Sequence, residues 1–388
     1  MNRNIDLDSF PYVIVGSGLL GSVLAEQIAS QLDRQVLVIE KREHIGGNCY
    51  SEEDGETGIE CHRYGTHIFH TANEKVWNYI NRFTTFNTYR HQVLTSCKGR
   101  MYQFPINLET INTFYNVNLR PYEVDAFMAR VRGSAERPPA NFEEQAIALL
   151  GPDLYEAFFK YYTFKQWQLD PRDLPASIFN RLPFRKNYNE NYFFDQWQGI
   201  PQKGYTHLFN RLLSHKNITL LLDTDYFDIR HRLARNCTLI YSGPIDRFFD
   251  YSLGRLSWRT LRFEKEVIPM EDYQGNAVIN FPESDIPYTR IHEPRHLHLE
   301  RDYPTDKTVI LREYSLPDNG DAPFYPIPSE ANHRLLTQYR ALAEKLPRTY
   351  IGGRLGDYKY YDMDQTIHRA LELFEQSILP ASNADQHA

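Results

Sequence analysis

The chain has 388 residues and a formal net charge of −7 at pH 7, and 14% of its residues are aromatic. This length allows two or three domains with a large core. Because no run of basic residues is longer than Lys41-Arg42, the composition argues against nucleic acid and anionic membranes as partners. The polar start of the chain, Met1 to Phe10, and the lack of a long apolar segment lead us to expect a cytoplasmic protein.

The segment from Tyr12 to Asn48 is organised as a nucleotide-binding unit. A β-branched run, Tyr12 to Val15, predicts a buried strand, and a helix is expected from about Leu19 to Leu32. Three glycines in GxGxxG spacing join the two, and they are Gly16, Gly18 and Gly21. We expect the first to allow the turn, the second to admit a pyrophosphate at the helix N-terminus, and the third to bring the helix close to the strand.

An acid follows the second strand of this unit. Gln35 to Ile39 predicts that strand, and Glu40 stands at its carboxyl end, where a carboxylate would accept the hydroxyl groups of an unphosphorylated ribose. A second glycine pair, within His44 to Asn48, could approach an extended cofactor, which favours FAD over NAD. The predicted cofactor residues in this part of the chain are Gly16, Gly18, Leu20, Gly21, Glu40, Lys41, Gly47 and Asn48.

No metal site is predicted. His67 and His70 have no third ligand nearby and lack the HExxH spacing, and the four cysteines show no CxxC or other metal-like spacing. We expect the two histidines to line the cofactor cleft or to satisfy local hydrogen bonds.

The middle of the chain is predicted to be helical. It follows a hairpin from Val93 to Phe104 that turns at Lys98-Gly99. Helices are expected at Leu108 to Tyr115, Pro121 to Val131, Phe142 to Leu150, and Pro152 to about Trp167. On the last helix Leu154, Phe158 and Tyr162 would share one face, which is usually a core stripe. Tyr162 and Trp167, near the end of that helix, could leave the core for a ligand.

The segment from Asp170 to Asn191 is predicted to be a mobile lid, because it carries prolines and polar residues with few periodic contacts. Arg181 and Arg185 flank Pro183, and arginines on a mobile segment over a cleft suggest closure on phosphate. A solvated surface loop is the alternative.

The second half of the chain returns to the first sheet and then builds another. Thr219 to Leu222 and Thr238 to Gly243 predict strands of the cofactor sheet, whereas alternating strands from Trp258 to Tyr314 predict an antiparallel sheet. A final helix begins near Asp362, and its N-terminus would favour an electron-rich reduced flavin. We expect a frayed tail from Pro380 to Ala388.

These elements predict an α/β protein, with a Rossmann-like FAD-binding domain, an inserted helical domain and an antiparallel β-sheet substrate layer. The FAD-binding domain is expected to be discontinuous and to comprise residues 1–95, 200–257 and 345–388. The helical domain would cover 105–175. The sheet, or substrate, domain would cover 96–104, 176–199 and 258–344, with the lid near 170–191.

From Tyr12 to about Ile378, the sequence resembles the bacterial, FAD-dependent UDP-galactopyranose mutase family. The motifs that carry the resemblance stand in the family's order, and they are VGSGLLGSV, IEKREHIGGN, RYGTHIFHT, EEQAIALLGPDLYEAFFKYYTFKQW, RLPFR, NYFFDQWQGIP, KGYTHLF, YSGPIDRFFDY, NAVINF, PYTRI and GGRLGDYKYYDMDQ.

The resemblance implies a redox-neutral isomerisation of UDP-galactopyranose to UDP-galactofuranose. Reduced FAD would be the nucleophile that attacks the anomeric carbon and expels UDP, before the sugar opens and recloses. A UDP-sugar would be the small-molecule partner. We expect NADH or NADPH as the reductant of the flavin, and a homodimer.

Several site residues follow from the resemblance alone. Arg185 and Arg290 match the family's pair that holds the diphosphate, and two guanidinium groups there would also make UDP a better leaving group. Together with His67, beside the flavin, they are the expected catalytic residues. The expected substrate-binding residues are Phe158, Tyr162, Trp167, Arg185, Trp197, Asn280, Arg290, Tyr314 and Tyr360. Near the cofactor the resemblance adds His67, Arg354, Tyr360, Asp362 and Met363.

Four positions depart from the family pattern and leave the substrate open. Tyr161 and Gln168 replace glycines, Trp197 replaces a tyrosine, and Lys203 stands where the family has GGYT. One alternative is therefore a related mutase for another UDP- or dTDP-sugar, such as UDP-N-acetylgalactosamine or a 6-deoxy sugar. The others are a flavin oxidoreductase of the amine-oxidase type and a flavin-binding regulatory protein without turnover.

Overall fold

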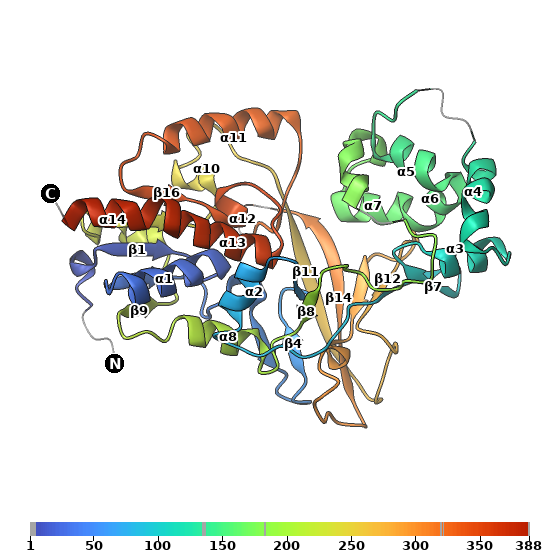
Figure 1. Ribbon diagram of the computed structural model, residues 1–388, viewed down its shortest axis with the longest axis horizontal. Helices are drawn as coiled ribbons and strands as arrows, with labels where there is room; N and C mark the ends of the chain where they lie inside the picture. The colour runs from blue at the N-terminus through green and yellow to red at the C-terminus, as the bar shows by residue number, and fades with distance from the viewer. Residues whose placement is uncertain (1–4, 134–136, 182–183, 319, 321, 387–388) are drawn as a thin grey trace.

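The computed structural model describes residues 5–133, 137–181, 184–318, 320 and 322–386. Figure 1 shows three parts: a parallel sheet with helices near both chain ends, a bundle of helices on the opposite side, and a long sheet between them. The predicted α/β architecture, with its inserted helical domain and its antiparallel layer, is confirmed. None of the helices in these ranges has the length and apolar character needed to span a bilayer.

The parallel sheet has five strands in the order β16-β10-β1-β2-β9. Their bounds are Tyr12–Val15 (β1), Val36–Ile39 (β2), Ile218–Leu221 (β9), Thr238–Tyr241 (β10) and Thr349–Ile351 (β16). Both faces are covered, as the apolar strands predict. Ile14 packs with α1 (Leu19–Gln31), whereas Val13 joins a separate apolar cluster with Leu37.

The end of the chain packs on the same sheet. Helix α13 (Met363–Leu373) lies against α1 and continues through a π-helical turn, Phe374–Ile378, into α14 (Leu379–Gln386). The expectation of a frayed tail from Pro380 is therefore wrong as far as Gln386. A proline inside a helix clashes with the carbonyl group four residues before it, and the wider π turn directly before Pro380 explains how the helix passes it.

The second sheet has seven strands in the order β15-β11-β14-β13-β12-β6-β7. Their bounds are Val93–Cys97 (β6), Arg100–Phe104 (β7), Trp258–Ile268 (β11), Val278–Asn280 (β12), Arg290–His292 (β13), Thr308–Pro317 (β14) and Tyr325–Pro326 (β15). All neighbours are antiparallel except β12 and β6, which run parallel. The predicted hairpin is confirmed. The strand β6 crosses the predicted domain boundary between residues 95 and 96, because all of it pairs within this sheet.

The helical bundle consists of α3 (Leu108–Tyr115), α4 (Val124–Arg132), α5 (Phe142–Leu150), α6 (Pro152–Phe158) and α7 (Lys160–Trp167). The segment predicted as a single helix from Pro152 to Trp167 is divided into α6 and α7 at Phe159, where φ is −119° and the helix is distorted. The Phe159 ring is buried and meets the edge of the Phe179 ring at 5.2 Å between centroids. Burial of this ring stabilises the break, so Phe158 and Tyr162 lie on different helices.

The predicted lid is anchored to the bundle at its start. Phe179 lies in a 3-10 helix, Ala176–Arg181, is fully buried, and meets Phe142 at 5.3 Å between ring centroids. Residues 176–181 therefore pack with the helical domain, whereas the sequence assigned them to the sheet. Pro183, at the centre of the predicted lid, lies outside the described residues.

Helix α11 (Glu330–Ala343) also differs from the predicted domain division. Its buried residues Leu336 and Tyr339 share an apolar cluster with Ile245 and Leu256, so α11 covers the parallel-sheet domain, as Figure 1 shows. The remaining elements are β3 (Ser51–Glu53), β4 (Glu60–His62), β5 (Phe69–Thr71), α2 (Glu74–Ile80), β8 (Trp197–Gly199), α8 (Gly204–Leu212), α9 (Tyr226–Ile229), α10 (Ile245–Phe248) and α12 (Gly353–Gly356).

Gly21 lies where α1 approaches β1 with no room for a side chain. A Cβ atom there would lie 2.0 Å from the Gly16 carbonyl oxygen. We therefore expect Gly21→Ala to displace α1 and to lower the free energy of unfolding by about 1–3 kcal/mol. Gly55→Ala is the control, because nothing lies within 4 Å of a Cβ atom at Gly55. Urea denaturation compares the two, and equal stability would contradict the packing described.

Candidate functional site

A cavity lies at the carboxyl ends of β1, β2 and β10 and is also lined by the segment after β16. The predicted cofactor residues that line it are Gly16, Gly18, Leu20, Glu40, Lys41, Gly47, Asn48, His67, Arg354 and Met363. Gly21, Tyr360 and Asp362 are not among the lining residues; Gly21 packs against the Gly16 carbonyl group and Asp362 caps α13. Residues from early and late parts of the sequence therefore meet at the carboxyl edge of the parallel sheet, which is where such sheets bind dinucleotides.

Two glycine loops meet at this cavity. Gly16 has a φ of +99°, and a Cβ atom there would lie 2.2 Å from Ser242 Oγ. Gly47 has a φ of +57°, and a Cβ atom there would lie 3.2 Å from Gly18 Cα. Glycine relieves both the backbone strain and the close approach, and the exposed backbone amides suit a pyrophosphate.

Glu40 stands at the end of β2, as predicted, and is buried. Its Oε2 accepts hydrogen bonds from the Ser17 backbone N–H and hydroxyl groups, both at 2.9 Å, and its Oε1 accepts one from the Arg42 N–H at 3.0 Å. A carboxylate oxygen accepts more than one hydrogen bond, so Oε1 retains capacity for a ribose hydroxyl group.

The sequence analysis missed one wall of the cavity. Residues 224–227 and Arg247 form it. Arg247 donates to Asp225 at 2.7 Å, and its guanidinium lies 4.6 Å from the centroid of the Phe227 ring. A flat ring beside a paired arginine suits a planar base. The strand end at Ser242-Gly243-Pro244, which leads into α10, was the signal that could have found it.

His67 presents a neutral ring to the cavity. Burial lowers the pKa of His67 to about 4, so the ring is uncharged at pH 7. Its Nδ1 lies 2.7 Å from the Gly65 carbonyl oxygen, which can only accept, so Nδ1 carries the proton and Nε2 is the acceptor nitrogen. His70 instead pairs with Asp195 at 2.6 Å and stacks on Phe193 with ring centroids 3.7 Å apart.

A second group of polar side chains gathers around Arg290 on the seven-stranded sheet. Arg290 Nη2 donates to the Tyr162 hydroxyl at 2.5 Å and so connects β13 to α7. Asn280 is its partner in the β12–β13 ladder. Asn280 Oδ1 is buried and has no hydrogen-bond partner among the described residues. A cation beside an unpaired acceptor suits a ligand that carries both phosphate and hydroxyl groups.

The carboxylate of Glu313 holds Arg290 in place. Glu313 is buried, and its Oε1 lies 3.4 Å from Arg290 Nε, while its Oε2 lies 2.9 Å from His292 Nε2. Burial alone would raise the pKa of Glu313, but Arg290 and the hydrogen bonds from His292 and Thr289 hold it at about 2. The carboxylate is therefore ionised at pH 7 and accepts the His292 Nε2 proton.

A tyrosine pair connects the Arg290 group to the cofactor cavity. The rings of Tyr325 and Tyr360 stack with centroids 5.7 Å apart, and the guanidinium of Arg354 lies 5.0 Å from the Tyr360 ring centroid. Tyr192 lies near both groups. Burial raises the pKa of its phenol to about 12, Arg290 opposes this increase, and Tyr360 adds to it. The sequence analysis missed Tyr192 and Tyr325. Tyr192 lies within the motif NYFFDQWQGIP, which could have identified it.

The chain matches the family model GLF, described as UDP-galactopyranose mutase, over residues 157–360. A model of an NAD(P)-binding Rossmann-like domain matches residues 14–83. A Klebsiella pneumoniae protein named probable UDP-galactopyranose mutase is 42% identical over 387 residues, which cover 99% of this chain and 97% of that protein. The chain belongs to the UDP-galactopyranose mutase family.

Another relative has a different substrate in its name. The dTDP-fucopyranose mutase of Escherichia coli is 39% identical over 372 residues, which cover 93% of this chain and 96% of that protein. Membership of the UDP-galactopyranose mutase family therefore makes this chain a mutase of nucleotide sugars, and leaves both the nucleotide and the sugar open.

Solved structures agree with the fold. The crystal structure of a reduced UDP-galactopyranose mutase aligns over 95% of this chain and 94% of that chain, with a TM-score of 0.75 at 14% identity. A putrescine oxidase variant aligns over 95% and 99%, with a TM-score of 0.54 at 10% identity. A mutase and an oxidase share this fold, so the fold alone does not distinguish the two activities.

Arg185, the other arginine matched to the family's diphosphate pair, is engaged within its own segment. It is buried, and its guanidinium donates to the carbonyl oxygens of Asn189 at 2.8 Å and Tyr192 at 3.4 Å. It also lies 4.3 Å from the centroid of the Phe194 ring. Arg185 thus shapes the segment that carries Tyr192. Arg181 ends the preceding 3-10 helix, and its side chain lies outside what the structure describes.

Tyr314, which the resemblance matches to a substrate-binding tyrosine, does not join the Arg290 group. It follows Glu313 on β14, and side chains alternate between the faces of a sheet. Glu313 faces Arg290, so Tyr314 points to the opposite face, where its hydroxyl donates to Glu264 at 2.7 Å. The tyrosine that the structure brings to the site is Tyr325.

Three aromatic residues expected at the substrate occupy packing positions. Phe158 is buried in the bundle and meets the Tyr102 ring at 5.1 Å between centroids. Trp197 stacks on Trp77 with centroids 5.8 Å apart. Trp167 is partly buried at the end of α7, against the main core. The structure therefore gathers Tyr162, Asn280, Arg290 and Tyr360 around one site, whereas Phe158 and Trp197 pack against other aromatic rings.

Two departures from the family pattern flank Tyr162 on α7. Gln168 ends the helix with a φ of +53°, a left-handed conformation in which glycine costs least. Its side chain donates to the Lys165 carbonyl oxygen at 3.0 Å, which offsets part of that cost. Tyr161 is exposed, and its hydroxyl donates to Glu156 at 3.2 Å.

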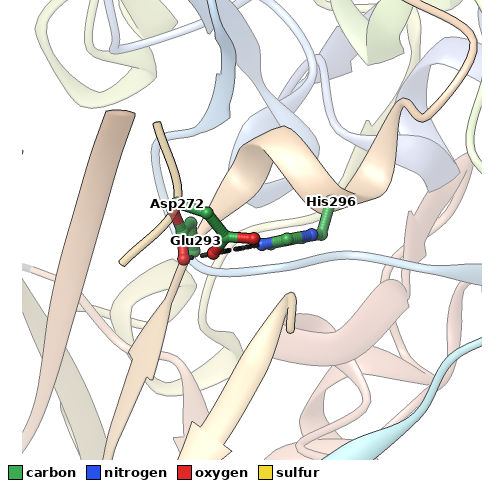
Figure 2. A group of neighbouring side chains, drawn as sticks. All are labelled: Asp272, Glu293 and His296. Atoms are coloured by element: carbon green, nitrogen blue, oxygen red, sulfur yellow. Dashed lines mark hydrogen bonds and ion pairs between the residues drawn. The ribbon is translucent and has the colours of Figure 1, made fainter. Parts of the chain in front are cut away.

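Figure 2 shows a group of Asp272, Glu293 and His296, whose donor atoms lie within 4.8 Å of one another. The buried Glu293 carboxylate already accepts hydrogen bonds from the backbone N–H groups of Tyr273 and Gln274, each at 2.9 Å. His296 Nε2 lies 3.1 Å from Asp272 Oδ1 and 3.5 Å from Glu293 Oε2. These contacts clamp the loop after β11, and they give no ground for assigning a metal.

The His296 clamp makes stability depend on pH. Burial disfavours the charged ring, yet Glu293 and Asp272 raise the pKa of His296 above its usual value. Its contribution is therefore fully present below the unfolded pKa of about 6.5 and is lost as pH rises through the folded pKa.

We expect His296→Asn to lower the free energy of unfolding by about 1 kcal/mol near pH 6, and by less near pH 9. Urea denaturation at both pH values measures the difference. His333→Asn, at an exposed position on α11, is the control. A loss that is the same at both pH values would contradict the charged clamp.

Proposed function

We propose that the protein is an FAD-dependent mutase that interconverts the pyranose and furanose forms of a nucleotide sugar, with UDP-galactose as the first candidate. The position of Arg290 supports this most. The guanidinium is held by Glu313 and Tyr162 beside the unpaired Asn280 oxygen, and the stacked tyrosines lead from that group to Arg354 at the cavity. Arg290, a cation that could hold a diphosphate, is therefore next to a cavity that could hold a cofactor.

The residues of the cavity fit FAD. The glycine loops admit the pyrophosphate, Glu40 retains an acceptor for the ribose, and the wall at Asp225 and Arg247 suits the adenine. When bound and reduced, FAD would supply an electron-rich nucleophile for the anomeric carbon of the sugar. We expect NADH or NADPH as its reductant, and a cytoplasmic homodimer remains the expectation from the sequence.

The protein's own residues would bind and polarise the substrate. Arg290 would hold the diphosphate and stabilise the negative charge that grows as the nucleotide leaves. Neutral His67 would offer an acceptor nitrogen, not a charge, at the cofactor cavity. The first turn of α13, which contributes Met363 and Thr366 to the lining, adds the positive end of a helix dipole, which favours a reduced, electron-rich ring.

A dTDP-linked 6-deoxy sugar is the second candidate substrate. The relative named dTDP-fucopyranose mutase supports it, because it is 39% identical and covers nearly the whole chain. The departures also lie close to Tyr162, since Tyr161 is on the same helix, α7, and Gln168 is its C-cap residue.

Dithionite-reduced protein, incubated separately with UDP-galactopyranose and dTDP-fucopyranose, tests the function. We expect a furanose product without stoichiometric consumption of electrons, since ring contraction is redox-neutral. Oxidation of one flavin per product would instead identify an oxidoreductase of the amine-oxidase type. A higher kcat/KM for the dTDP sugar would overturn UDP-galactose as the substrate.

Arg290→Ala should remove nearly all activity while FAD remains bound. Loss of a charge-assisted hydrogen bond costs about 1.5–3 kcal/mol, or roughly 10- to 100-fold in kcat/KM, even before any effect on the leaving group. Arg262→Ala is the matched control, because Arg262 stacks over Tyr314 on the far face of the sheet. Flavin absorbance and kcat/KM check both variants, and an active Arg290→Ala protein would exclude the proposed role.

A further inference from the structure

The loop between β12 and β13 folds around a buried ammonium group. A hydrogen bond from the Phe281 N–H to the Thr289 carbonyl oxygen, at 2.9 Å, closes the base of this loop. Within it, four carbonyl oxygens lie 2.6, 2.8, 2.9 and 3.1 Å from Lys165 Nζ, and they belong to Phe281, Glu283, Ile286 and Tyr288.

Lys165 comes from another part of the molecule. It lies on α7, one turn after Tyr162, and is 9% exposed. An ammonium group has three N–H donors and no acceptor, so four converging carbonyl oxygens saturate it. Burial lowers the pKa of Lys165 to about 8, against the carboxylates of Glu283 and Asp285, which favour the charged form.

The loop is directly continuous with the substrate group. Asn280 is the last residue of β12 and Arg290 the first of β13, and each of these strands has three residues. No further ladder pair therefore separates the loop from the Asn280–Arg290 pair. A displacement of the loop would therefore move the backbone that carries these two side chains.

We propose that Lys165 is a positioning residue for the nucleotide sugar, because its ammonium holds the loop of residues 281–288 against α7 and so sets where Arg290 and Asn280 stand relative to Tyr162. This inference rests on the proposed function, which assigns the diphosphate to Arg290. The Tyr162–Arg290 hydrogen bond is the second link between the same helix and the same strand. Lys165 itself need not touch the ligand.

Lys165→Met removes the ammonium and keeps the length of the side chain. We expect it to retain FAD and its absorbance spectrum, and to raise the Kd for UDP and the KM for the nucleotide sugar about tenfold or more, since four buried carbonyl oxygens lose their charged donor. Lys160→Met is the matched control, because Lys160 lies on the same helix and its ammonium pairs with Glu156 at the surface. It should behave as the wild type.

A pH titration of UDP affinity reports on the wild-type protein without any substitution. Above about pH 8 the amine would lose a donor and its charge, so UDP should bind more weakly there to the wild type and to Lys160→Met. The Kd of Lys165→Met should stay flat. Should Lys165→Met fail to fold, the wild-type curve alone decides.

Unchanged KM and Kd in a folded Lys165→Met protein, or a flat wild-type curve across pH 8, would overturn the inference. A wild-type protein that binds neither UDP nor dTDP is a different result. It would overturn the proposed function, and the role of Lys165 with it.

Discussion

The ion pair between Glu313 and Arg290 is the interaction on which the substrate side depends. A guanidinium at the edge of a protein core needs a counter-charge, and a diphosphate can provide it only while the ligand is bound. Glu313 provides it at other times, and His292 and Thr289 fix the carboxylate by hydrogen bonds. Arg290 is thus charged and oriented before any ligand arrives, so little reorganisation is needed when an anion binds.

The seven-stranded sheet determines which side chains can meet at this ion pair. Glu313, Arg290 and Asn280 lie on adjacent strands in register, and the helical bundle approaches them through Tyr162. Tyr325, from the edge strand β15, stacks on Tyr360, which follows the parallel sheet. Each of the three parts of the molecule therefore contributes to one surface, beside a cavity at the carboxyl ends of the parallel strands.

Local patterns were sufficient to predict the glycine loops and the acid that line one side of the cavity. The glycine spacing, the acid after β2 and the second glycine pair all lie within one segment, and their geometry depends on near neighbours. Long-range contacts decided the rest. The break at Phe159 depends on Phe179, which joins from the next segment, and the face on which Tyr314 lies depends on the pairing of β14 with β13. Arg185 was assigned to the diphosphate from its place in a family motif. The orientation of its guanidinium, however, is set by hydrogen bonds to carbonyl groups later in the chain.

The order of strands in the parallel sheet constrains how the molecule can be made. Its five strands come from widely separated stretches, and its edge strand β16 precedes residues that complete the cavity lining, among them Arg354 and Met363. During synthesis on the ribosome, the glycine loops emerge first. The residues after β16 that line the other side of the cavity emerge only when nearly the whole polypeptide has been made. Flavin capture is consequently a late event in biogenesis, and a chain cut short before β16 cannot assemble the site, however complete its first Rossmann unit.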